Sequence, residues 1–227
     1  MPKALRTRKQ DQQIDIKPPF FNIDHNKITK NVKNKLIIIY SKMNRLLLHV
    51  CCANCGLVPI EMLKIKFELT LFWYNPNIQP SEEHDKRLEN FYQLAKIYNL
   101  NYLTGPDDAL AWDRMIQKRR LINKPEGGQR CTACFKWRLK ATAQTAQENN
   151  FNYFATTLGL SRYKNTELID HLGRIATEPH QVEYYPLQAD KDLAAQQELM
   201  LSKKYNFYRQ KYCGCLYAKT VLAKNKK

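Results

Sequence analysis

The chain has 227 residues, of which 44% are hydrophobic and 11% aromatic, enough to bury one sizeable core. It has no run of 18 apolar residues and no secretory signal at its N-terminus, so we expect no membrane span and a cytoplasmic protein. The formal net charge is +16, and residues 1–45 hold eleven Lys or Arg against three Asp. This excess favours a polyanionic partner, although a merely basic, Lys-biased protein is the alternative.

Three regions are expected along the chain. Residues 1–43 read as a basic extension that is polar, contains Pro18 and Pro19, and shows little periodicity, so part of it is expected to be flexible. A folded domain follows over residues 44–218, and a basic tail over 219–227 ends the chain.

Strand and helix patterns alternate from Arg45 onward. Short apolar runs predict strands at 46–50, 69–74, 101–103, 153–157 and 182–185. Helical spacing and flanking turns predict helices at 56–66, 82–99, 109–119 and 132–149, with a loop at 124–130 and further helices in the remaining gaps. This order predicts an α/β fold, a Rossmann-like three-layer domain with a mainly parallel sheet. Neither GxGxxG nor GxxxxGK[ST] occurs, so neither familiar phosphate site is expected.

The seven cysteines fall into three groups, and none is isolated. The groups are Cys51, Cys52 and Cys55; Cys131 and Cys134; and Cys213 and Cys215. In a reducing compartment, thiols at such close spacings are more often metal ligands than structural disulfides. Two CxxC spacings, a CxC and an adjacent pair together indicate a metal site, which we expect where the first strand delivers its cysteines to the carboxyl edge of the sheet.

The number of thiols bears on which metal they hold. A four-cysteine zinc site leaves three thiols over, whereas a [4Fe-4S] cluster with four thiolates and a single iron with three uses all seven. Neighbouring residues that leave a strand point in opposite directions, so we expect Cys51 and Cys52 to serve two adjacent centres. A zinc site and metal-free redox disulfides remain as alternatives.

Five segments in register carry a family likeness across most of residues 45–218. They are HVCCANC (49–55), FWYNPNI (72–78), KPEGGQRCTACFKWRL (124–139), TTLGLSRYKN (156–165) and YRQKYCGC (208–215). Together they resemble the cobalamin-independent epoxyqueuosine reductases of the QueH type. The chain departs from the commoner pattern at Asn54, often Pro, and at Arg162 and Tyr163, often Pro-His.

The resemblance implies an oxidoreductase for the last step of queuosine formation, which turns the epoxide of epoxyqueuosine at the wobble position of tRNA into the cyclopentene of queuosine. It also implies a [4Fe-4S] cluster beside a mononuclear iron, and an electron donor that the sequence does not identify. By this likeness six cysteines match the family's ligands, and Cys55 is the replaceable ligand of the lone iron. The six are Cys51, Cys52, Cys131, Cys134, Cys213 and Cys215.

Two residues are candidates for a general acid that protonates the departing oxygen. Asp108 matches an Asp that the family carries, and Tyr74 ends the second predicted strand. A helix N-cap is the alternative for Asp108, and packing is the alternative for Tyr74. His49 precedes the first cysteine by two residues, and we expect it to be a hydrogen-bonded core histidine rather than a ligand.

Basic residues flank the cysteine motifs and are expected to hold phosphates of a tRNA anticodon loop, whose single-stranded bases can stack on aromatic rings. The candidates are Arg130, Lys136, Arg138, Lys164, Arg209 and Lys211. Competing interpretations are a zinc-stabilised RNA-binding module, a metal-free thiol oxidoreductase, and an iron-sulfur enzyme that transfers sulfur to tRNA, whose usual ATP motif is absent.

Overall fold

The structure, a computed structural model, describes residues 43–218 of the chain. Nearly all of the extension expected over residues 1–43, and the whole tail expected over 219–227, lie outside the described residues, so both stay predictions. Among the described residues, no helix is both long and apolar enough to cross a membrane.

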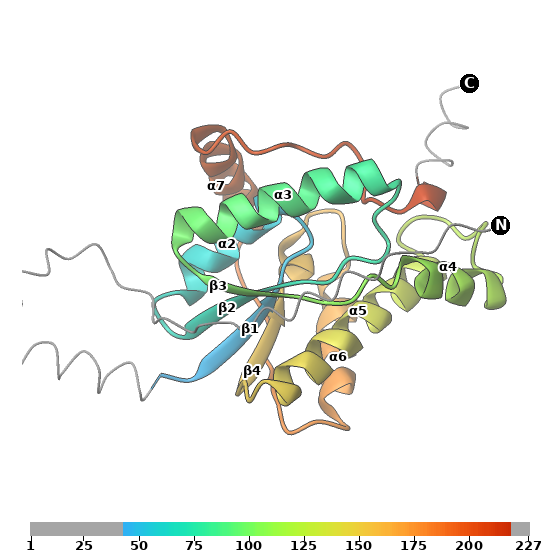
Figure 1. Ribbon diagram of the computed structural model, residues 1–227, viewed down its shortest axis with the longest axis horizontal. Coiled ribbons are helices and arrows are strands. Elements are labelled where there is room, and N and C mark those ends of the chain that lie inside the picture. Colours follow the sequence, from blue (N-terminus) through green and yellow to red (C-terminus); the bar gives the residue numbers. More distant parts are fainter. Residues whose placement is uncertain (1–42, 219–227) are drawn as a thin grey trace, which may run out of the picture.

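A five-stranded sheet forms the centre of the domain (Figure 1). Its order is β3-β2-β1-β4-β5, and every neighbouring pair is parallel. The strands are β1 (Arg45–His49), β2 (Glu68–Trp73), β3 (Asn101–Thr104), β4 (Tyr153–Thr156) and β5 (Glu183–Tyr184). The parallel sheet and the Rossmann-like α/β class expected from the alternation of elements are confirmed.

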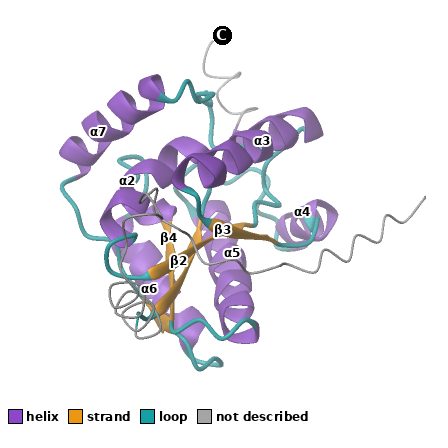
Figure 2. Cartoon of the chain, turned by 60° about the vertical axis from the view of Figure 1, so that its left-hand side comes forward, coloured by secondary structure: helices purple, strands orange, loops and turns teal. Residues whose placement is uncertain are grey.

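Helices cover both faces of the sheet and complete the three layers (Figures 1 and 2). On one side lie α2 (Ala53–Leu63) and α3 (Ser81–Tyr98), with α7 (Lys191–Lys204) packed against α2. On the other side lie α5 (Gln129–Glu148) and α6 (Thr166–Thr177). The helix α4 (Ala109–Lys118) packs beside the first turns of α5, and a 3₁₀ turn, Thr157–Leu160, follows β4.

The central strand β1 explains why both faces need a covering layer. Leu46 and Leu48 belong to the apolar cluster under α2 and α3, whereas Leu47 belongs to the cluster under α5 and α6. All three side chains are fully buried, and burial of each contributes about 2 kcal/mol. A continuous apolar run is therefore what a strand in the middle of a three-layer domain requires.

Several element boundaries differ from the expected ones. The helix expected at 56–66 begins at Ala53, and the one expected at 132–149 begins at Gln129. The strand expected over 182–185 pairs with β4 only at Glu183 and Tyr184. The helices α6 and α7 were expected only as unbounded fillers of the gaps, although Leu168, Leu172 and Ile175 recur at helical spacing in α6.

Candidate metal centre

The topological switch point of the sheet lies between β1 and β4. The chain proceeds from β1 to β2 and β3 in one direction, and then returns to place β4 on the other side of β1. In such sheets the crevice beyond the carboxyl ends of the two strands is where ligands bind. Here the backbone N–H of Cys51, after β1, donates to Thr157 Oγ1, after β4, at 3.2 Å. Thr157 Oγ1 in turn donates to Cys51 Sγ at 3.3 Å.

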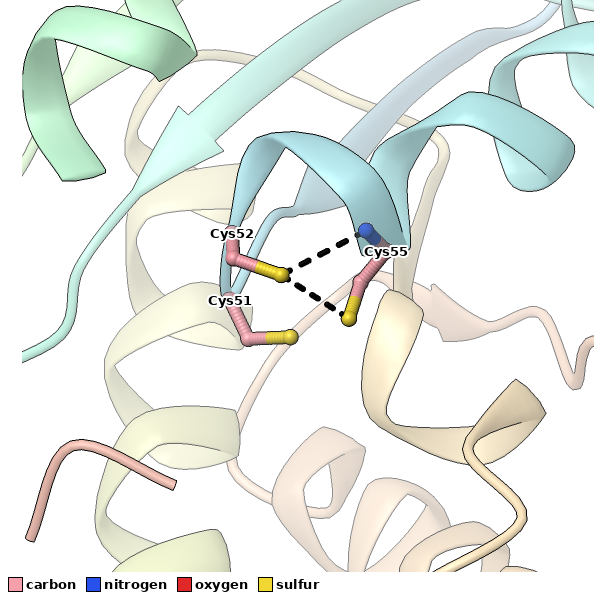
Figure 3. Close-up of side chains that lie close together, drawn as sticks. All are labelled: Cys51, Cys52 and Cys55. Carbon is pink, nitrogen blue, oxygen red and sulfur yellow. Dashed lines mark hydrogen bonds between the residues drawn. The ribbon is translucent and has the colours of Figure 1, made fainter. Parts of the chain in front are cut away.

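The sulfurs of Cys51, Cys52 and Cys55 converge at this point, all within 4.8 Å of one another (Figure 3). Cys52 is the N-cap of α2, and its sulfur accepts the backbone N–H of Cys55 at 3.4 Å. The Cys52 and Cys55 sulfurs are 2.9 Å apart. The expectation that Cys51 and Cys52 point in opposite directions is wrong, because β1 ends at His49 and the chain has already turned into α2.

Hydrogen bonds link these three thiols and shift their pKa values in opposite directions. Hydrogen bonds from Cys52 and Cys55 hold the pKa of Cys51 well below its usual value. The pKa of Cys52 is raised to about 12, chiefly by its bond to Cys51, and that of Cys55 is raised as well. The group therefore favours a thiolate at Cys51. Burial lowers the pKa of Lys164, but the charges of Cys213 and Cys51 outweigh this effect and the net shift is upward.

The other two cysteine groups lie at the same end of the sheet. Cys131 and Cys134 stand in the first turns of α5, and Cys134 shares a buried cluster with Cys215. Burial raises the pKa of Cys134 to about 12, with a further contribution from Cys213. Cys213 lies within electrostatic reach of Cys131 and Cys134, and Lys164 lies within reach of both Cys213 and Cys51, so the segments around 51, 131 and 213 lie near one another. Within residues 43–218, only the first group brings three ligand atoms within 4.8 Å.

Arg87 of α3 holds the loop that carries Cys213 and Cys215. Its guanidinium donates to the carbonyls of Tyr212 at 3.0 Å and Cys213 at 3.2 Å, and pairs with Glu83 at 2.7 Å. Between the two cysteines, Gly214 has φ +106, and an added Cβ would lie 2.9 Å from Ile78 and 3.1 Å from Arg87. Glycine is required here by both the backbone conformation and the close approach of Ile78, in the loop before α3.

Arg130 and Arg138 are buried, with 1% and 2% of their surfaces exposed, so their expected contacts with tRNA phosphates are not supported. Arg130 donates to the carbonyls of Ile122 and Lys124. Arg138 donates to Asn75 Oδ1. Neither guanidinium pairs with a carboxylate among the described residues, and each has one N–H without a partner there. Each lies within electrostatic reach of a cysteine. Burial raises the pKa of Cys215 and Arg130 opposes this rise, whereas Arg138 adds to the hydrogen bonds from Cys52 and Cys55 that lower the pKa of Cys51.

This arrangement fits an anionic metal centre. Buried cations are stable when opposite charges compensate them, and thiolate ligands bound to a metal supply such charge. The donor set consists of soft sulfurs, which suit iron-sulfur and zinc sites. The residues present are therefore suited to hold a thiolate-bound metal, and the convergent sulfurs of Cys51, Cys52 and Cys55 are its best-formed part.

His49 is a core histidine, as expected. It is fully buried, Nδ1 bonds to Thr156 Oγ1 at 2.8 Å, and Nε2 lies 3.2 Å from the Tyr74 carbonyl. Burial, with a smaller contribution from Arg138, lowers its pKa to about 3, so the ring is neutral at physiological pH. Both ring nitrogens are engaged within the protein, and neither is free to bind a metal.

Comparisons with known proteins show which family the chain belongs to. The model of the family "Epoxyqueuosine reductase QueH" matches residues 46–221. The chain belongs to this family. It is 33% identical to epoxyqueuosine reductase QueH of Staphylococcus epidermidis over 77% of this chain and 76% of that protein. The QueH protein of Acinetobacter baylyi is 37% identical, covering 77% and 80%, and that of Thermotoga maritima is 34% identical, covering 78% and 91%.

In this QueH-family chain, Tyr74 and Asp108 are hydrogen-bonded partners. Tyr74 Oη donates to Asp108 Oδ2 at 2.5 Å and accepts the indole N–H of Trp137 at 2.7 Å. Asp108 occupies the N-cap position of α4, yet its carboxylate makes no capping bond, since Asp107 accepts the N–H of Ala109 instead. Burial and the bond to Asp108 raise the pKa of Tyr74, so the phenol keeps its proton at neutral pH.

Tyr74, Asp108 and Trp137 line a cavity of about 610 Å³ beside α5. Lys136, which is exposed, also lines it. The remaining tRNA-contact candidates are spread more widely: Lys211 is exposed, Lys164 is half-buried, and Arg209 lies 3.8 Å from Glu198. Two aromatic residues near the motifs, Phe72 and Trp73, are core residues, 1% and 3% exposed.

Sequence reasoning missed two residues that shape the centre. Arg87 stands in an ordinary polar helix, and no spacing rule links it to a loop 126 residues further on. Gln210 donates to Cys52 Sγ at 2.9 Å. In the motif YRQKYCGC only the cysteines and the charged neighbours of Gln210 were considered as functional residues. Proximity to the CxC motif was the one available signal for Gln210.

Replacing Arg87 by Leu is expected to destabilise the fold by about 3 kcal/mol, because Glu83 then loses its cationic partner and two carbonyls lose their hydrogen bonds to the guanidinium. Hydrogen exchange should also accelerate in the loop around Cys213. Denaturant unfolding and exchange measured by mass spectrometry test both effects. The control is Arg114→Leu, an exposed residue of α4, which should change stability by less than about 0.5 kcal/mol. Equal stabilities for the two variants would show that Arg87 does not hold the loop around Cys213.

Proposed function

We propose that this protein reduces epoxyqueuosine to queuosine in tRNA, in the cytoplasm, with its cysteines holding a [4Fe-4S] cluster and an adjacent mononuclear iron. The overall reaction converts an epoxide, two electrons and two protons into an alkene and water. Membership of the epoxyqueuosine reductase QueH family supports the reaction. The convergence of three sulfurs at the switch point of the sheet is the observation that carries the metal assignment.

The proposed ligands come from all three cysteine groups. Cys51, Cys52 and Cys55 are favoured by their sulfur distances, and Cys131, Cys134, Cys213 and Cys215 by their electrostatic interactions at the same end of the sheet. When bound, the iron centres supply electrons and a Lewis acid for the epoxide oxygen. The buried guanidiniums of Arg130 and Arg138 compensate the negative charge of the thiolates.

Tyr74 is the proposed proton donor. Its phenol remains protonated at neutral pH, and the hydrogen bonds to Asp108 and Trp137 hold the hydroxyl in one position. Asp108 is a positioning residue in this scheme, because its carboxylate accepts a hydrogen bond from the phenol, which keeps its proton, and so orients the hydroxyl. The cavity that these residues line has the size of a small-molecule site, which suits a single extruded nucleotide.

The exposed cations near the centre are proposed to hold the anticodon loop. Lys136 stands on α5 two residues beyond Cys134, and Lys211 lies two residues before Cys213. Phosphate contacts from such side chains position an RNA without reading its sequence. Lys164 and Arg209 are weaker candidates, because their charges face the cysteines and Glu198.

Loss of one sulfur is expected to abolish metal binding. Cys52→Ala and Cys213→Ala should lose most of their iron and reduce product formation by more than about 100-fold, because the ligand set is incomplete. Iron and sulfide analysis after anaerobic purification, and incubation with epoxyqueuosine-containing tRNA and a reductant, test this. Thr132→Ala, a half-buried change between two cysteines, is the control. Full iron content and activity in either cysteine variant would refute the ligand assignment, and zinc without iron in the wild type would refute the cofactor.

Removing the Tyr74 hydroxyl should slow the reaction without affecting the metal. Tyr74→Phe is expected to lower the single-turnover rate about 10²- to 10⁴-fold with unchanged iron content, because the proton donor is lost. The matched control is Tyr184→Phe, which removes a similar bond, from Tyr184 Oη to Asp170 at 2.8 Å, on β5. If both variants react at the wild-type rate, Tyr74 is not the donor.

Lys136→Ala should weaken tRNA binding and make it less dependent on salt. The slope of log affinity against log salt concentration is expected to fall by about 0.7, the contribution of one phosphate contact in single-stranded RNA. Binding titrations at several salt concentrations measure this slope. Lys66→Ala is the control, because Lys66 is exposed between α2 and β2. It lies at the amino end of the strands, opposite the end that carries the cysteines. Identical slopes for the two variants would count against this surface.

A further inference from the structure

A side-chain amide reaches the sulfur group from the C-terminal segment of the domain. Gln210 Nε2 donates to Cys52 Sγ at 2.9 Å, in addition to the backbone N–H of Cys55 at 3.4 Å. The Cys52 sulfur therefore accepts two N–H groups, whereas the Cys51 sulfur accepts the hydroxyl of Thr157 and the neighbouring thiols. The segment that carries Gln210 lies 158 residues from Cys52 in sequence, so tertiary structure must hold it there.

The orientation of the Gln210 amide is fixed by its neighbours. Asn54 is 3% exposed, and its Nδ2 donates to the Tyr208 carbonyl at 2.7 Å, a group that can only accept. Asn54 Oδ1 accepts the hydroxyl of buried Ser202 at 2.7 Å. The same Nδ2 donates at 3.4 Å to Gln210 Oε1, so the oxygen of Gln210 faces Asn54 and its nitrogen faces the sulfur.

We propose that Gln210 is a positioning residue for the metal centre: its amide holds the Cys52 sulfur in place and raises the reduction potential of the iron that Cys52 binds. The proposal rests on the proposed function, which supplies the iron. A hydrogen bond to a thiolate ligand withdraws electron density from it and so stabilises the reduced, more negative state of the centre. Asn54 acts through Gln210, because it keeps the donating nitrogen turned toward the sulfur.

The test is a redox titration of the reconstituted full-length protein under anaerobic conditions, followed by electron paramagnetic resonance. Gln210→Met keeps the length of the side chain but has no donor. We expect its midpoint potential to shift to a more negative value, with iron and sulfide contents equal to those of the wild type. The centre whose signal shifts is the one that Cys52 ligates. A negative shift in either signal supports the proposal, and a positive shift overturns it.

Gln147→Met is the matched control. Gln147 is exposed near the end of α5, sixteen residues beyond Cys131, or about 24 Å along the helix. Its amide oxygen contacts His180 rather than a sulfur. The potential of this variant should equal that of the wild type.

A second pair of variants tests the role of Asn54. Asn54→Ala frees the Gln210 amide to rotate, so the potential should shift in the same direction by a smaller amount. In the Gln210→Met background, Asn54→Ala should cause no further shift, although it lowers the melting temperature in both backgrounds. A merely structural residue would shift the potential equally in both.

Each failure has its own signature. Equal potentials in the wild type and Gln210→Met, at equal iron content, would overturn this proposal and leave the proposed function standing. A wild-type protein that binds no iron would overturn both. If Gln210→Met binds too little iron to titrate, Asn54→Ala decides: an unchanged potential overturns the proposal, and a negative shift supports it.

Discussion

The compensation of buried charge is the constraint on which the functional end of this domain depends. Arg130 and Arg138 are buried without a carboxylate partner among residues 43–218. The charge of each favours the thiolate form of a nearby cysteine. Carbonyl and amide oxygens accept hydrogen bonds from both guanidiniums but do not neutralise their charge, so neighbouring groups that become anionic stabilise these cations further. The thiols are those groups. This end of the domain is therefore suited to thiolates, whose own burial would otherwise disfavour them.

The parallel sheet brings the cysteines together, although they come from three distant parts of the chain. Two of the groups stand at helix starts: Cys52 caps α2, and Cys131 lies in the first turn of α5. The third group has no element of its own and depends on Arg87, which binds the carbonyls of Tyr212 and Cys213. Helix N-termini also favour negative charge, so the fold contributes to thiolate stability by where it places its elements as well as by its cations.

The sequence was sufficient for features that local pattern determines, and insufficient for those that tertiary contacts determine. Uninterrupted apolar strands such as β1 predict a sheet buried on both faces, and this was confirmed. By contrast, Arg138 and Lys136 carry the same charge two residues apart on one helix, yet only Lys136 is exposed. A cysteine is not among the usual N-cap residues, so the early start of α2 was also not predictable from known cap preferences.

The same limit applies to Asn54, which departs from the proline common at this place in the motif. The sequence pattern gave no contact for this side chain, which is buried and bonded to Tyr208, Gln210 and Ser202. A proline has no amide to make these bonds. With asparagine, the C-terminal segment is joined to the first turn of α2, and the Gln210 amide that donates to Cys52 is held in one orientation. Because the members of a hydrogen-bonded network hold one another in place, the buried Asn54 amide can affect a sulfur ligand that it does not touch.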